Sequence, residues 1–197
     1  MKAVSVERDY EPIEAGVDII IYKTKTLPEK VFRETFKYFL FITFDDLLMP
    51  HFFNHLKQFL IEVGEERFWL TVIDPEPKLY FGVNFTFFGS FEFSNADTEN
   101  DYISALNEYP KDSLADALAH NSNSLLISSF TYKWAIFGNR DADIAICAFS
   151  DRTQMELFES FYGYDLLDGV KAAAKYAYSA TGDNALIETF CKNYVTE

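Results

Sequence analysis

The segment that decides the fold is Tyr132-Lys133-Trp134-Ala135-Ile136-Phe137-Gly138-Asn139-Arg140-Asp141-Ala142-Asp143-Ile144-Ala145-Ile146, which Cys147-Ala148-Phe149 continues. Its first part predicts a strand over 132–137, and Gly138-Asn139-Arg140-Asp141 is typical of a turn. The second strand, 144–149, is apolar on both of its faces, whereas a strand with one wet face would alternate with polar residues. We therefore expect 144–149 to be a central strand of a sheet that is covered on both sides.

On the C-terminal side of this hairpin, the spacing of apolar residues predicts three helices. Gly182 is expected to end the second of them, because Gly tolerates the left-handed conformation, and Asp183 is expected to cap the third. The predicted helices cover about 152–162, 165–180 and 183–194.

On the N-terminal side of the hairpin, strands flank a helical region. Residues 97–121 predict two short helices that break at Pro110, the second of them capped by Asp112 or Ser113. Apolar residues alternate from Leu79 to Phe88, which predicts a strand. The remaining predicted strands in this part of the chain are 68–73, 90–94 and 124–130.

The first third of the chain predicts one strand and two helices. A short strand is expected over 17–23. The segment Thr26-Leu27-Pro28-Glu29 is typical of a capping box, and the apolar residues after it predict a helix to Phe44. A second helix is predicted from Pro50 to a stop at Gly64. Strands and helices come in runs, which indicates α+β: one domain over 1–197, with a mainly antiparallel sheet packed against several helices.

The composition indicates which partners the charge favours. The 197 residues include 31 acidic and 17 basic ones, for a net charge of −14. This charge disfavours nucleic acid and anionic membrane surfaces, both of which need Lys and Arg, and it favours a basic protein as partner. No apolar run reaches the ~20 residues of a membrane span, and the charged first residues are unlike a signal peptide. Because the two cysteines also form no disulfide pattern, we expect a soluble, cytoplasmic protein.

The acidic residues gather in two segments of the chain. Residues 92–116 contain seven acids and one lysine, and residues 141–168 contain seven acids and one arginine, so each segment has a net charge of −6. Such segments could form one face that steers a basic partner, with neighbouring tyrosines as anchors. The alternative is that the acids only keep an aromatic-rich chain soluble. The predicted partner-binding residues are Asp97, Glu99, Asp101, Tyr102, Glu108, Tyr109, Asp141, Asp143, Glu156 and Glu159.

Motifs that would indicate catalysis are missing from the sequence. It contains no nucleophile elbow, no phosphate-binding glycine motif and no kinase signature, so we expect no enzyme and no cofactor. His51 and His55 are four residues apart on a predicted helix and could share a metal with Asp45 or Asp46, but two partly exposed histidines are the simpler interpretation, and no metal site is expected. Cys147 is expected to be a core residue, although a Cys–His pair can form between residues distant in sequence.

The density of phenylalanine leaves a further alternative open. Most of the 21 Phe residues lie between Phe32 and Phe93, where they are expected to fill a core. They could instead line an apolar pocket of a small-molecule-binding domain or enzyme, formed by residues such as Phe81, Phe85 and Phe87. A third possibility is an adaptor subunit that dimerises through an exposed strand edge.

The stretch from Tyr132 to Ile146 resembles the Trp-containing hairpin of some small bacterial immunity proteins, which neutralise polymorphic or contact-dependent toxins. The resemblance covers about 15 of the 197 residues. It implies an acidic cytosolic inhibitor that binds a toxin domain stoichiometrically, and it assigns no binding residue. The charge agrees with it, because a toxin nuclease domain needs basic residues to hold phosphate.

Overall fold

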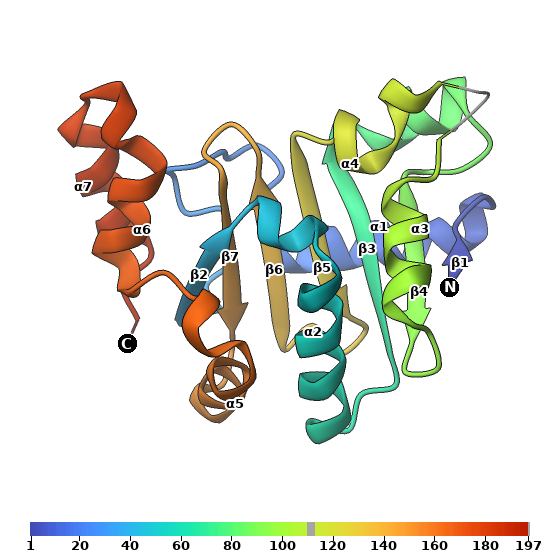
Figure 1. Cartoon of the computed structure of the whole chain (residues 1–197). Helices are drawn as coiled ribbons and strands as arrows, with labels where there is room; N and C mark the ends of the chain where they lie inside the picture. The colour runs from blue at the N-terminus through green and yellow to red at the C-terminus, as the bar shows by residue number, and fades with distance from the viewer. Residues whose placement is uncertain (110–112, 197) are drawn as a thin grey trace.

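The computed structural model describes residues 1–109 and 113–196, which are organised around one seven-stranded sheet (Figure 1). The strand order is β1-β4-β3-β5-β6-β7-β2, and every neighbouring pair is antiparallel. This confirms the predicted α+β class. The strands are β1 (Lys2–Ala3), β2 (Tyr38–Thr43), β3 (Arg67–Asp74), β4 (Ser90–Ser94), β5 (Ser124–Ser129), β6 (Trp134–Asn139) and β7 (Ile144–Phe149).

Helices cover both faces of the sheet, so the apolar residues form two cores (Figure 1). On one face lie α2 (Pro50–Glu62), α3 (Glu99–Leu106), α4 (Leu118–Asn121) and α5 (Arg152–Tyr162). On the other lie α1 (Glu7–Ile20), α6 (Gly169–Tyr178) and α7 (Asn184–Asn193). The described residues also contain short helical turns: η1 (Asp45–Leu48), η2 (Pro77–Gly82), η4 (Leu114–Asp116), η5 (Gly163–Asp165) and η6 (Ser179–Thr181).

The strand β7 shows why its sequence is apolar throughout. It lies between β6 and β2, and all six of its residues are buried. Cys147 packs into the core beneath α2 and α5, whereas its neighbour Ile146 packs into the core beneath α6 and α7. The prediction of a covered central strand is therefore confirmed, because each face of β7 meets a helical layer.

The predicted helix from Pro50 and the three predicted C-terminal helices are also confirmed. Pro50 begins α2, and Gly64, with a φ of 73°, follows its end. Gly182 adopts the left-handed conformation, and Asp183 caps α7 by accepting from the amide of Ala185 at 2.8 Å. The predicted strands over 68–73, 90–94 and 124–130 correspond to β3, β4 and β5.

The predictions for the first third of the chain are largely wrong. Residues 17–20 belong to α1 rather than to a strand, and the helix contains Pro12. Its buried residues follow a helical spacing, but Pro12 and the β-branched run Ile19-Ile20-Ile21 favour another assignment locally. No helix forms in the described segment between Thr26 and Phe44, where one was predicted. The C-terminal part of this segment instead forms β2, which pairs over six residues with β7.

The strand predicted from Leu79 to Phe88 is a further correction. Pro77–Gly82 form a π-helical turn, and Leu79 and Val83 are 75% and 74% exposed instead of facing the core. Phe81 and Phe87 are buried, and Tyr80, Phe85 and Phe88 are half-buried, so the aromatic residues anchor an irregular segment whose remaining residues are exposed. The predicted break at Pro110 and the predicted cap at Asp112 lie outside the described residues, whereas Ser113 precedes η4.

Candidate functional site

The helices α2, α3 and α5 form a continuous layer, with α2 between the other two (Figure 1). Asn54 of α2 donates a hydrogen bond to Glu99 Oε2 of α3 at 2.6 Å. On the opposite flank of α2, the ring of His55 lies 5.0 Å from that of Tyr162 in α5. We call the solvent-facing residues of α2, α3 and α5 the three-helix surface.

Negative charge predominates on the three-helix surface. Its acids are Glu62, Glu99, Asp101, Glu156 and Glu159, whereas its strong bases are Lys57 and Arg152. Both bases are engaged locally: Lys57 Nζ donates to the carbonyl of Asp97 at 2.8 Å, and Arg152 pairs with Glu156 at 2.9 Å. The surface therefore retains unneutralised carboxylates on both sides of α2.

Two of the predicted binding residues are held by hydrogen bonds, Asp101 at the N-terminus of α3 and Asp97 in the turn before it. Thr98 and Asp101 form a capping box, in which each side chain accepts from the other residue's backbone amide. Hydrogen bonds from Thr98 hold the pKa of Asp101 below its usual value. Burial works against ionisation of Asp97, but hydrogen bonds from the N-terminal ammonium and Ser94 still lower its pKa. Asp97 and Asp101 therefore have roles in folding, whatever they contact outside the chain.

The two predicted aromatic anchors differ in exposure. Tyr109 is 45% exposed, so it can meet a partner. Tyr102 is fully buried, and its hydroxyl donates to the carbonyl of Leu47 at 2.7 Å. The prediction of Tyr102 as a surface anchor is thus wrong: position 102 faces the core because α3 turns that side toward the rings of Phe53 and Phe93.

Asp141 and Asp143 are separated from the three-helix surface. They lie in the turn between β6 and β7, where Asp143 has a φ of 47°. Asp143 accepts a hydrogen bond from Tyr176 of α6 at 2.7 Å, and this bond raises the pKa of Tyr176 to about 12. Asp141 is a lining residue of a cavity on the α1 side of the sheet.

The two acidic segments are therefore brought together only in part. Glu99 from the first segment and Glu156 and Glu159 from the second share the three-helix surface, and the exposed Glu108 follows the end of α3. Asp141 and Asp143, from the second segment, do not join them. A stretch of sequence that is acidic throughout crosses a turn and a helix, which places its carboxylates at different ends of the molecule.

The residues considered for metal binding or catalysis do not form a site. Among residues 1–109 and 113–196, no group of three or more His, Cys, Asp and Glu side chains is arranged to hold a metal. His51 Nε2 lies 3.7 Å from Asp46 Oδ1, and the rings of His51 and His55 are 6.1 Å apart. Cys147 is buried, and burial raises the pKa of its thiol, so the reactive thiolate is disfavoured.

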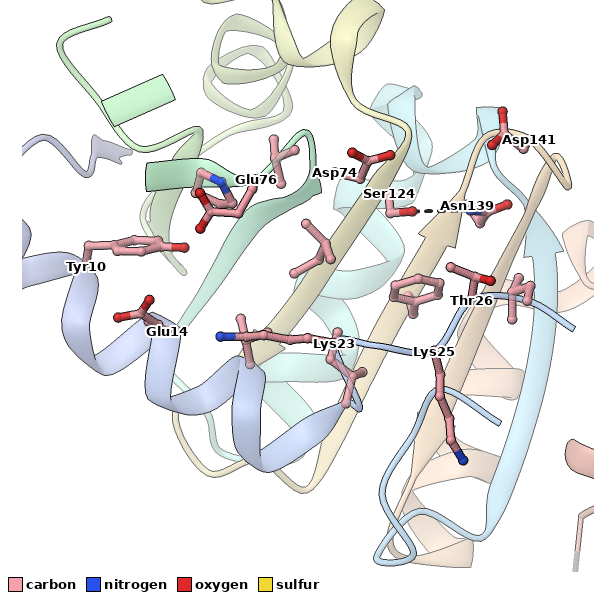
Figure 2. Close-up of a pocket in the computed structure, with 17 residues that line it drawn as sticks. Tyr10, Glu14, Lys23, Lys25, Thr26, Asp74, Glu76, Ser124, Asn139 and Asp141 are labelled. Atoms are coloured by element: carbon pink, nitrogen blue, oxygen red, sulfur yellow. Dashed lines mark hydrogen bonds between the residues drawn. The ribbon is translucent and has the colours of Figure 1, made fainter. Parts of the chain in front are cut away.

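A cavity of about 550 Å³ lies between α1, the segment after it and the ends of β3, β5 and β6 (Figure 2). Its apolar lining includes Val17, Ile21, Leu27 and Phe137. None of the three phenylalanines suggested for a pocket lines it. Phe81 and Phe87 are buried in the opposite core, and Phe85 packs against that core. The polar lining residues are Tyr10, Glu14, Lys23, Lys25, Thr26, Asp74, Glu76, Ser124, Asn139 and Asp141.

The sequence contains no local signal for this cavity. Its walls come from five separate segments, each with only one to five lining residues. Within each segment, these residues look like ordinary parts of a helix, a strand end or a turn. Only the packing of α1 across the sheet brings them together.

Comparison of the chain with protein-family models, with curated proteins and with solved structures finds no match. Within the described part of the chain, no helix has both the length and the apolar character needed to cross a membrane.

Proposed function

We propose that this chain is an acidic cytoplasmic protein that binds a basic protein and inhibits it stoichiometrically, as an immunity protein inhibits a toxin domain. The observation that carries the proposal is the excess of carboxylates on the three-helix surface, where α3 and α5 contribute acids on either side of α2. A surface of this charge attracts a basic partner at long range and raises the rate of association.

Apolar contacts that could add affinity lie close to these acids. Ile61 of α2 is 55% exposed, and Tyr109, beyond the end of α3, is 45% exposed. Interfaces gain most of their affinity from a few such anchors, whereas charges at the rim mainly govern the association rate. The proposal therefore assigns steering to the carboxylates and much of the retention of the partner to neighbouring apolar residues.

The test removes charge from the proposed surface without changing side-chain size. The variant Glu99→Gln, Glu108→Gln, Glu156→Gln, Glu159→Gln is compared with the wild-type chain in affinity capture from the native host, followed by binding and activity measurements on the purified partner. We expect a basic partner in a 1:1 complex whose activity the wild type inhibits. Binding should weaken about tenfold or more in the variant, through slower association, and should weaken with added salt.

The matched control carries the same change in net charge elsewhere. Glu11, Glu29, Glu34 and Glu188 are exposed and lie outside the three-helix surface, so their replacement by Gln should alter affinity much less. Equal losses in the two variants would indicate a general charge effect and no defined surface. A partner that is acidic, or one that keeps its full activity in the complex, would contradict the proposed inhibition.

A further inference from the structure

The cavity on the α1 side of the sheet has a charge imbalance that its ion pairs do not remove. Glu14 pairs with Lys78 at 2.8 Å, outside the lining, and Lys23 pairs with Asp18 at 3.0 Å. These two lining charges are therefore neutralised by neighbours. The lining charges that remain are the carboxylates of Asp74, Glu76 and Asp141 and the ammonium group of Lys25.

The contacts of these remaining groups leave the carboxylates available. Asp74 accepts from the neutral amide of Asn123 at 3.0 Å, and Glu76 accepts from the backbone amide of Leu79 at 2.6 Å. Within the described ranges, Asp141 has no ion pair. Neutral donors do not cancel a negative charge, so these three carboxylates, which Figure 2 shows spread from Glu76 across Asp74 to Asp141, leave the rim of the cavity electronegative.

The remaining lysine is directed elsewhere. Lys25 Nζ lies 4.7 Å from the centre of the Tyr22 ring, a cation–π contact, and Figure 2 shows its side chain extending away from Asp74, Glu76 and Asp141. The inner wall of the cavity is uncharged, because Phe137, Val17 and Leu27 present apolar surface there. The cavity thus combines an apolar wall with an anionic rim.

We propose that this cavity binds a small organic cation, with an apolar or aromatic body against Phe137 and a protonated amine at the rim formed by Asp74, Glu76 and Asp141. The volume of about 550 Å³ lies within the range of small-molecule sites, roughly 300–1,000 Å³. A bare metal ion fits less well, because the described residues contain no group of three or more carboxylate, His or Cys side chains arranged as ligands. An anionic ligand would meet the uncompensated carboxylates.

The test uses three probes that share one body and differ in charge: 2-phenylethylamine, 2-phenylethanol and phenylacetate. Binding to the full chain is measured by isothermal titration calorimetry at neutral pH, where the amine is protonated. Because a charge-assisted hydrogen bond is worth more than a neutral one, we expect the amine to bind about tenfold or more tightly than the alcohol. Phenylacetate should bind more weakly than either.

Two variants locate the binding within the cavity. Asp74→Asn with Glu76→Gln keeps the hydrogen-bond acceptors, and Asp141→Asn alters a side chain without an ion pair among the described residues. Each should lower amine affinity about tenfold and leave the alcohol unchanged. The control Glu11→Gln with Glu29→Gln, outside the lining, should bind the amine like the wild type. The proposal is overturned if phenylacetate binds as tightly as the amine, if both cavity variants bind the amine at full strength, or if no probe binds at millimolar concentration.

Discussion

The buried hydroxyls of Tyr102 and Tyr162 provide a matched pair for testing the packing of α2, α3 and α5. Both side chains belong to the same core. The Tyr102 hydroxyl donates to the carbonyl of Leu47 at 2.7 Å, whereas the Tyr162 hydroxyl has no hydrogen-bond partner among the described residues. Replacing either residue by Phe keeps the ring and removes only the hydroxyl, so the two variants isolate the hydrogen bond from the packing.

The expected changes in the free energy of unfolding have opposite signs. Tyr102→Phe leaves the buried carbonyl of Leu47 without this donor, which should destabilise the chain by about 1–3 kcal/mol. Tyr162→Phe removes a polar atom that is buried without a partner, so its stability should be unchanged or should rise by up to about 1 kcal/mol. The two variants should therefore differ by roughly 2 kcal/mol.

Urea unfolding followed by circular dichroism measures this difference. With an m-value of about 2 kcal/mol/M, the midpoint of Tyr102→Phe should fall about 1 M below that of Tyr162→Phe, with m unchanged. The wild type should lie between them or equal Tyr162→Phe. If Tyr162→Phe proved the less stable variant, the assignment of hydrogen bonds in this core would be refuted, and with it the argument that Tyr102 has a structural role.

Three further predictions concern packing, capping and ionisation. Gly138→Ala should destabilise the chain by about 1–3 kcal/mol in urea unfolding, because the added Cβ would lie 2.5 Å from Leu47 Cδ1 and overpack the core. Thr98→Ala should cost about 1 kcal/mol at neutral pH. The Asp101 carboxylate in the same capping box has a lowered pKa, so its contribution is present above the ordinary carboxyl pKa of about 4, and the effect of Thr98→Ala should shrink as pH falls below it. Burial raises the pKa of three tyrosines in the folded state: Tyr102, Tyr162 and Tyr194. Their contribution to the free energy of unfolding should be fully present below the ordinary tyrosine pKa of about 10 and should be lost as the pH rises further. Their phenolate absorbance should appear only on unfolding.

The elements that could be predicted from the sequence are those whose pattern is set locally. The helix α2 has buried residues at 52, 53, 56, 59 and 60, which is the spacing of one helical face, and Pro50 and Gly64 mark its limits. The strand β7 has no polar residue on either face, and a covered central strand accounts for that pattern. In these cases, burial on folding and the local sequence favour the same structure.

The segment 17–43 could not be predicted because its structure depends on distant partners. The residues of β2 form a strand through pairing with β7, which lies about a hundred residues further along the chain. Without that pairing, the spacing of Phe32, Phe36 and Phe39 equally matches a helix. In α1, Pro12 and a β-branched run argue against the helix, but the packing of Ile13, Val17 and Ile20 into the core outweighs them.

The candidate sites differ in the same way. The acidic character of the segments around α3 and α5 could be read from the sequence, but the position of each carboxylate in space could not. Glu156 and Glu159 lie on the three-helix surface, whereas Asp141, from the same segment, lines the cavity on the α1 side. Because the sheet separates these two regions, neutralising Glu156 and Glu159 should leave amine binding in the cavity unchanged, and Asp141→Asn should leave capture of the basic partner unchanged. If either variant lost both amine binding and capture of the basic partner, the two regions would act as one site. The carboxylates of the second acidic segment would then act together on both ligands.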